Sequence, residues 1–341
     1  MPFYRRVSDS SIKQLFTILS ETVSTKYRPL ATNILWLGWV GALCLMSLVA
    51  YFVPDWKKLV IFLSAPFFVT IFSYFYVPES ARWLRSVRRY EESKNVLRKI
   101  ARYNKNLFDE NLHITEVKIS KKRTTPLDLF KTKKLAVYTL SQGFVWFVNS
   151  MVYYGISLAS DELGGSLYLN WVYVSLVEIP SAILAIVCSN RFGRKLTTII
   201  AMIITGAFCI VVPFMPPSYN GNPSRVIFGV LGKMFVSLSY DVISVWSIEI
   251  FSTDIRSKGM SFVYIMNGIG SISSPWIAKA LRIYSEHLPF AVMGGFAIIG
   301  GLVAIPLPET RGQDTQDTME EADSNQEDLG TAVACSNSSV N

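Results

Sequence analysis

Charged residues, cysteines and histidines are scarce in this chain of 341 residues. Charged residues make up 17% of the sequence, whereas a soluble domain carries about 25%. The 4 cysteines are scattered, with the spacing of neither a metal site nor a disulfide framework. The 2 histidines, His113 and His287, have no cysteine or serine partner at catalytic spacing, and no phosphate-binding loop occurs. We therefore expect no catalytic residues, no cofactor and no metal site, and the sequence does not indicate an enzyme.

Apolar residues make up 50% of the chain, and they form long blocks with the charges between them. A membrane-spanning helix needs about 20 mostly apolar residues. The pattern predicts an all-α polytopic membrane protein with about eight transmembrane helices. The net charge of +8 then reflects basic residues beside a membrane, not a nucleic-acid surface. The predicted spans are residues 32–53, 59–77, 135–160, 167–190, 196–213, 226–248, 259–278 and 288–307.

Lysine and arginine are distributed unequally between the two sides of the predicted membrane. Most of the 33 basic residues precede the first span, follow the second span or occupy alternate turns beyond it. Cytoplasmic loops carry the excess of Lys and Arg in membrane proteins. The bias therefore predicts that both termini and the long charged segment after the second span are cytoplasmic.

Four short charged motifs follow one another at the predicted cytoplasmic ends of the spans. Residues 78–84 read Pro-Glu-Ser-Ala-Arg-Trp-Leu, and residues 190–195 read Asn-Arg-Phe-Gly-Arg-Lys. Residues 249–256 read Glu-Ile-Phe-Ser-Thr-Asp-Ile-Arg, and residues 308–312 read Pro-Glu-Thr-Arg-Gly. Each motif is a weak signal alone, but their order resembles that of sugar-porter-like transporters of the major facilitator superfamily.

Within this superfamily, the chain most resembles the organic cation/anion/carnitine transporter family, over about residues 20–320. Residues 153–155 read Tyr-Tyr-Gly, and residues 178–180 match its Glu-x-Pro. Residues 50–56 match its Ala-Tyr-x-x-x-x-Trp turn. True sugar porters carry Gln-Gln-x-Ser-Gly early in the third span, where residues 140–144 read Leu-Ser-Gln-Gly-Phe. A hexose site is therefore not expected.

The resemblance implies a partial major facilitator fold that lacks the first four transmembrane helices of the family. A helix with charges all round is expected within residues 85–102, on the membrane face. The expected domains are a cytoplasmic N-terminal segment (1–31), a two-helix remnant of the N-terminal bundle (32–77), a cytoplasmic linker (78–134), a six-helix C-terminal bundle (135–307) and an acidic disordered cytoplasmic tail (308–341).

The resemblance implies transport of organic ions across the plasma membrane by alternating access, and cations are favoured. An organic anion or carnitine-like zwitterion carrier is the first alternative, and a truncated, non-transporting isoform or fragment is the second. Gly268 stands where cation members have aspartate and anion members arginine, so this position does not discriminate. The expected partners are a small organic ion and the lipid bilayer, with no nucleic acid, and the oligomeric state stays open.

Three ionisable residues, Glu178, Lys233 and Asp241, lie within predicted spans. Because charges are costly inside a bilayer, each is a candidate functional residue. Asp241 follows Tyr240, and the resemblance implies the same aromatic–acid pair in organic cation members. A carboxylate there offers a counter-ion for an ammonium group. The alternative is a structural pair between Lys233 and either carboxylate.

Aromatic residues add a second candidate feature. Trp146 and Tyr153 are seven positions apart on the third span, so they share one helix face, and Tyr154 is adjacent. The resemblance implies an aromatic cage for cations with this spacing, and cation–π attraction would favour an ammonium there. The alternative is helix packing or lipid contact. The predicted substrate-binding residues are Trp146, Tyr153, Tyr154, Glu178 and Asp241.

Charged residues at the predicted cytoplasmic helix ends are candidates for a gate. Ion pairs that form in one state and separate in the other provide the two-state element of alternating access. Asn190 replaces the aspartate of the family motif, and Ser252 replaces its proline. The alternative role is anchoring by positive charge. The gating candidates are Glu79, Arg82, Arg191, Arg194, Glu249, Arg256, Glu309 and Arg311.

Overall fold

The secondary structure of the described residues is entirely helical, which confirms the predicted all-α class. The chain divides into two compact units, Met1–Lys121 and Lys122–Asn341. The domain boundaries proposed from the sequence stay predictions. The computed structural model describes residues 28–65, 84, 89–103, 125–163, 166–215, 224–251, 253–285 and 287–311.

The first unit contains helices α3 (Arg28–Phe52), α4 (Trp56–Ser64) and α7 (Tyr90–Tyr103). Asp55 precedes α4 in an extended conformation, and its side chain accepts the backbone N–H of Lys57 at 3.0 Å. This is the capping interaction that aspartate provides at a helix start. Helix α4 begins before the predicted second span, most of which lies outside the described residues. Helix α7 occupies most of the range in which a surface helix was expected.

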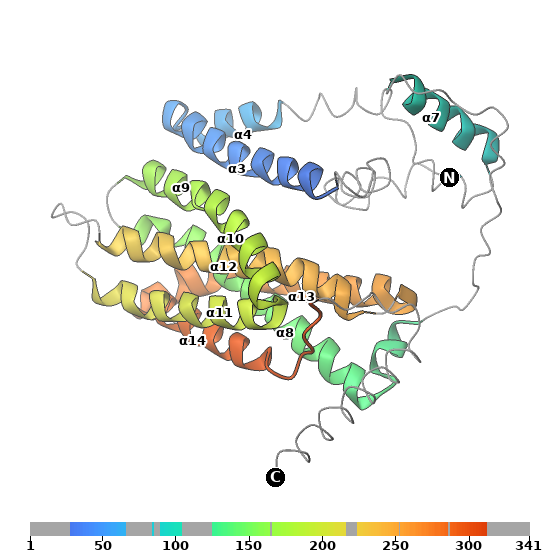
Figure 1. Ribbon diagram of the computed structural model, residues 1–341. Helices are drawn as coiled ribbons and strands as arrows, with labels where there is room; N and C mark the ends of the chain where they lie inside the picture. The colour runs from blue at the N-terminus through green and yellow to red at the C-terminus, as the bar shows by residue number, and fades with distance from the viewer. Residues whose placement is uncertain are drawn as a thin grey trace, which may run out of the picture. The chain divides into compact units, whose positions relative to one another are not determined.

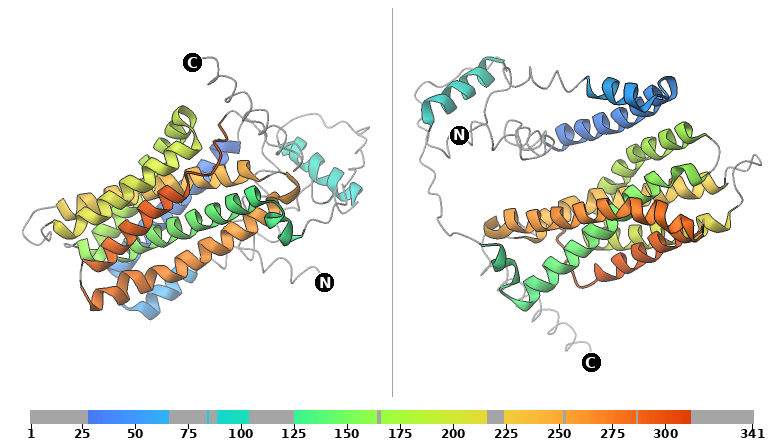
Figure 2. Two further views of the ribbon diagram at one scale, coloured as in Figure 1. Left: turned by 90° about the horizontal axis from the view of Figure 1, so that it is seen from below. Right: turned by 180° about the vertical axis from the view of Figure 1, so that it is seen from behind.

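The second unit is a bundle of helices that lie side by side (Figures 1 and 2). Helix α8 packs against α12, α13 and α14, while α11 packs against α12 and α14, and α10 against α12. The helices are α8 (Lys133–Leu158), α9 (Leu167–Leu176), α10 (Glu178–Phe192), α11 (Arg194–Val211), α12 (Ser224–Ile250), α13 (Thr253–Pro275) and α14 (Leu288–Val303).

Helix α8 supplies much of the bundle core because it carries no charged residue beyond its first turn. Buried side chains therefore occur all round it, including Val145, Val148 and Met151. A Cβ atom at Gly270 of α13 would overlap the backbone carbonyl of Phe147. Glycine at this position thus allows α13 to approach α8 closely, as small residues do between membrane helices.

Four helical segments among the described residues are long and apolar enough to span a membrane. Residues Leu37–Phe52 of α3 and all of α14 are shorter apolar helices. Helix α13 covers most of the remaining span predicted after residue 135. The four segments are Lys133–Leu158, Leu167–Phe192, Arg194–Phe214 and Ser224–Ile250.

Two predicted spans are interrupted by proline. Pro180 has no N–H to donate to the carbonyl of Leu176, so the fourth span is split at Val177 into α9 and α10. Pro275 ends α13, and a π-helical turn, Trp276–Ala280, follows it. Both interruptions give α10 and α13 ends inside the predicted spans.

Candidate functional site

The centre of the bundle holds a buried ion pair between α10 and α12. Lys233 of α12 is 1% exposed, and its Nζ atom lies 3.4 Å from Oε1 of Glu178. The ammonium group donates hydrogen bonds to Oγ of Ser157 at 2.9 Å and to the carbonyl of Tyr153 at 3.3 Å. Lys233, Glu178, Tyr153 and Ser157 form what we call the ion-pair cluster, which joins three helices.

Tyr153 contributes both its hydroxyl group and its ring to this cluster. The hydroxyl donates to the Glu178 carboxylate. The ring centroid lies 2.9 Å from the Lys233 ammonium, well inside the range of a cation–π contact. Lys233 thus has a carboxylate, an aromatic ring and two neutral acceptors around it, which are the partners that make burial of an ammonium group tolerable.

Asp241 lies eight residues beyond Lys233 on α12, which corresponds to a rise of about 12 Å. Its side chain is partly buried. Its carboxylate forms no hydrogen bond or ion pair with any residue that the structure describes. Of the two acids predicted for substrate binding, Glu178 therefore has a cationic partner, and Asp241 has none within that part of the chain.

Aromatic rings from α8, α12 and α13 meet beside this cluster. The ring of Tyr240 lies 5.3 Å from Trp146 and 5.4 Å from Tyr153, measured between centroids. Tyr264 lies 5.6 Å from Trp146, and Tyr154 lies 5.1 Å from Tyr153. The structure thus brings all three predicted aromatic residues into one group. The sequence interpretation missed the central position of Tyr240, although its place beside Asp241 gave a signal, and it missed Tyr264.

Trp146 is more enclosed than the other predicted aromatic residues. It is 1% exposed, and its Nε1 atom donates to Oγ of Ser247 at 2.7 Å. Gln142 donates to the same hydroxyl group. In this conformation the Trp146 ring packs against the rings of Tyr240 and Tyr264. Direct contact between Trp146 and a substrate stays a prediction.

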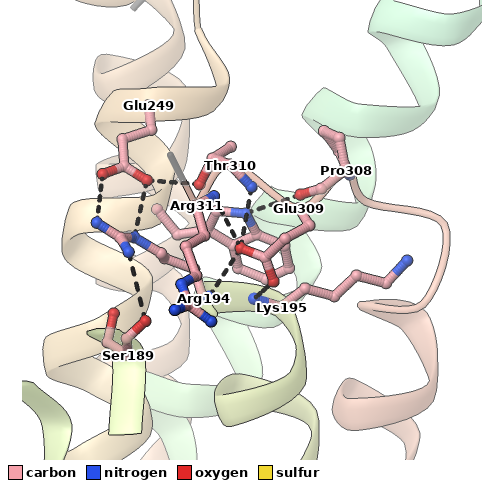
Figure 3. A network of polar contacts seen from close by, with 9 residues as sticks. Ser189, Arg194, Lys195, Glu249, Pro308, Glu309, Thr310 and Arg311 are labelled. Carbon is pink, nitrogen blue, oxygen red and sulfur yellow. Dashed lines mark hydrogen bonds and ion pairs between the residues drawn. The ribbon is translucent and has the colours of Figure 1, made fainter. Parts of the chain in front are cut away.

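A network of charged and polar groups joins the ends of α10, α11 and α12 to the residues after α14 (Figure 3). Arg194 donates from Nε and Nη2 to the two carboxylate oxygens of Glu249, both at 3.1 Å. Its Nη1 atom also donates to the Ser189 carbonyl at 3.3 Å. Two parallel hydrogen bonds make this ion pair directional. We call Arg194, Glu249, Glu309, Thr310 and Arg311 the charged network.

Glu309 binds the N-terminus of α11. Its carboxylate accepts the backbone N–H groups of Arg194 at 2.9 Å and Lys195 at 3.1 Å. These are amides that the helix itself leaves without partners, and the helix dipole also favours an anion there. Gly193 has a φ of 92°, and a Cβ atom at this residue would overlap the Glu309 carboxylate. Glycine is thus needed at position 193 both for the positive φ and to leave room for the Glu309 carboxylate.

The segment after α14 makes three further contacts in the same region. The Thr310 hydroxyl group donates to Glu249, and Arg311 donates to the Arg191 carbonyl at 2.6 Å. Nε1 of Trp246 donates to the Pro308 carbonyl at 3.0 Å. The segment after α14 therefore contacts α10 and α12 through both side chains and backbone.

The other predicted gating residues are placed differently. Arg256 donates to the Phe251 carbonyl at 3.2 Å, and its Nη2 atom has no partner among the described residues. The guanidinium group of Arg191 lies over the Phe192 ring at 5.9 Å. Glu79 and Arg82 lie outside the described residues. The structure thus brings Arg194, Glu249, Glu309 and Arg311 together, with Arg191 present through its backbone.

Membrane-length helices, a buried ion pair within the bundle and a charged network at one end of the bundle are consistent with a multi-pass membrane protein of the major facilitator type. The fold of a solved structure agrees. The proton:xylose symporter XylE bound to 6-bromo-6-deoxy-D-glucose matches with a TM-score of 0.55 at 19% identity, over 88% of this chain and 68% of that one. At this identity the likeness concerns the fold alone.

The sequence profile of the sugar (and other) transporter family matches residues 16–322, and the chain belongs to this family. Solute carrier family 22 member 1 of Sus scrofa is 29% identical over 93% of this chain and 58% of its own length. Member 3 of Rattus norvegicus is 30% identical over 90% of this chain and 56% of its own length. Member 13 of Homo sapiens is 32% identical over 89% of this chain and 55% of its own length. The resemblance predicted from the motifs is confirmed, and the chain spans about half the length of these relatives.

Proposed function

We propose that this chain binds small organic cations within its C-terminal bundle and takes part in moving them across the plasma membrane by alternating access. The observation that carries the proposal is the charge balance of the bundle. Lys233 neutralises Glu178, while Asp241 has no counter-charge among the described residues. A carboxylate without a counter-charge is costly in a membrane interior, and this cost favours the binding of a cation.

The aromatic group supports the same assignment. Tyr240 and Tyr153 lie on α12 and α8 near the two acids, and their rings contact each other. Faces of aromatic rings attract ammonium groups, by about 2 kcal/mol when water is excluded. A carboxylate beside aromatic rings therefore suits an organic ammonium better than a hydrated inorganic ion.

The charged network is the proposed gate, and we infer that its end of the bundle faces the cytoplasm with both termini. The Arg194–Glu249 pair and the contacts of Glu309 hold the start of α11, the end of α12 and the segment after α14 together in this conformation. Separation of these contacts would let the helix ends move apart. Such an element, with two arrangements, is what alternating access requires.

A zwitterion carrier is the second candidate, and the ion-pair cluster favours it. A ligand with both a carboxylate and an ammonium group could separate Lys233 from Glu178 and satisfy both charges. This candidate predicts dependence on Lys233 and Glu178 together, whereas the cation proposal predicts dependence on Asp241.

A matched set of ligands tests the proposal on the purified full chain in lipid nanodiscs. Choline, glycine betaine and their analogues in which carbon replaces the ammonium nitrogen have nearly the same shape but differ in charge. We expect choline to bind and the neutral and anionic analogues to bind at least about tenfold more weakly. Preference for betaine would support the zwitterion candidate, and preference for the anion would contradict both. Binding of none of them would favour a chain that does not transport.

A transport assay follows from the same proposal. In proteoliposomes that hold the full chain, an inside-negative potential should drive accumulation of labelled choline, because a potential of 100 mV contributes about 2.3 kcal/mol per charge. Equal choline uptake with inside-negative and inside-positive potentials would contradict the movement of a net positive charge.

A further inference from the structure

Lys233 occupies surroundings that have the chemistry of an organic cation site. Its ammonium group has a carboxylate at 3.4 Å, an aromatic ring at 2.9 Å and a hydroxyl acceptor at 2.9 Å. A free alkylammonium ligand would seek the same three kinds of partner. The Lys233 side chain therefore occupies a site that could otherwise accept an alkylammonium ligand.

The charges of the bundle centre can be counted. Among the described residues, only Glu178, Lys233 and Asp241 are acidic or basic side chains within the predicted spans. Their formal charges leave one negative charge, which resides on Asp241. Because uncompensated charge is costly in a low-dielectric interior, the complex should be stable when the ligand supplies one positive charge.

From this geometry we propose that Lys233 is a built-in cation that restricts the site to monovalent cations. The inference rests on the proposed function, because it assumes that organic cations bind near Asp241. Lys233 fills the position at Glu178 that a second ammonium group would need. Without Lys233, both carboxylates would lack a counter-charge, and the site should prefer a ligand with two ammonium groups.

Lys233, Ser237 and Asp241 follow one another at four-residue intervals along one side of α12. Ser237 lies one turn from Lys233 and one turn from Asp241, and its buried hydroxyl group has no hydrogen-bond partner among the described residues. The ammonium groups of an α,ω-diamine could then reach Glu178 and Asp241 with its chain passing Ser237. The preferred diamine length should match the distance between the two carboxylates.

Substitution of Lys233 tests this directly in the full chain in nanodiscs. Lys233→Met keeps an unbranched side chain of nearly the same length and removes the charge. We expect its preference for α,ω-diamines over choline to rise at least about tenfold relative to the wild type. Lys233→Arg keeps the charge and should keep the preference for choline.

A double variant separates charge from shape. Lys233→Met combined with Glu178→Gln restores one net negative charge, so the preference for monovalent cations should return. Glu178→Gln alone leaves a net charge of zero, and choline should bind at least about tenfold more weakly while Lys233 is still present. This second readout keeps the inference falsifiable if Lys233→Met is not monodisperse.

The outcomes distinguish this inference from the proposed function. If the wild type binds choline and monodisperse Lys233→Met keeps the wild-type preference, the role of Lys233 is wrong and the proposed function stands. A double variant that prefers diamines as strongly as Lys233→Met would also overturn it. If the wild type binds neither choline nor diamines, the proposed function itself fails.

Discussion

At the scale of single residues, Gly193 shows how a backbone position and a side-chain contact depend on each other. Its φ of 92° and ψ of 169° lie in a region that is nearly confined to glycine. Alanine there would be strained by about 1–3 kcal/mol and would displace the Glu309 carboxylate. We therefore expect Gly193→Ala to lower the melting temperature of the purified chain by several degrees.

Gly295→Ala is the matched control for this prediction. Gly295 lies within α14, and a Cβ atom added there meets no atom within 4 Å. Alanine favours the helix over glycine by about 1 kcal/mol. Equal melting temperatures for the two variants would contradict the constraint at Gly193.

The identity of the charged residues in the bundle could be predicted from the sequence, but their pairing could not. Glu178, Lys233 and Asp241 stand out because each interrupts an apolar run. Both acids were open as partners of Lys233, and Asp241 is the nearer one along the chain. The packing of α10 against α12 makes Glu178 the partner of Lys233. The two residues are 55 positions apart in the sequence, so no local sequence pattern could predict the pair.

At the scale of helices, the Arg194–Glu249 pair fixes α11 to α12. Each single charge reversal, Arg194→Glu or Glu249→Arg, places like charges at the contact and should open this end of the bundle. The double variant restores opposite charges and should recover part of the loss. The measurement is the rate at which a thiol reagent labels a cysteine at Ser189, beside Arg194, in a background free of other cysteines.

We expect faster labelling at position 189 in both single variants than in the parent, and a slower rate in the double variant than in either. Labelling that is equally fast in the double and single variants would show that the pair does not hold these helices together. Glu91→Lys, a charge reversal on the exposed face of α7, is the control and should leave the rate unchanged.

The helices themselves followed from the apolar runs, while their interruptions did not. Apolar length predicted α8, α11 and α12 well, because burial and the bilayer both favour such segments. The break at Val177 depends on the hydrogen bond that Pro180 cannot make, and a proline is often tolerated within a membrane helix. The contacts of Glu309 with α11 were also missed, since they join segments more than 100 residues apart.

At the scale of the whole molecule, the distribution of Lys and Arg predicts the orientation in the membrane. Lys99→Cys places a thiol on the exposed surface of α7, and Ser166→Cys places one between α8 and α9, at the opposite end of α8 from the linker. In intact cells, an impermeant thiol reagent should label position 166 and not position 99. Permeabilisation should expose position 99.

Each outcome of this labelling decides something different. Labelling of position 99 in intact cells would reverse the orientation and place the charged network outside the cell. Labelling at neither position before permeabilisation would place the protein in an internal membrane and contradict the plasma membrane proposal.

The central claim is that Asp241 is the uncompensated carboxylate that selects an organic cation. The most direct measurement is the affinity of the full chain in nanodiscs for choline and for its neutral carbon analogue, before and after Asp241→Asn. We predict that the substitution weakens choline binding about ten- to a hundredfold, since an interaction with a charged group contributes roughly 1.5–3 kcal/mol. Binding of the neutral analogue should change little, and Glu91→Gln, which removes a carboxylate from α7, should change neither. Unaltered choline affinity in a monodisperse Asp241→Asn protein would contradict the account.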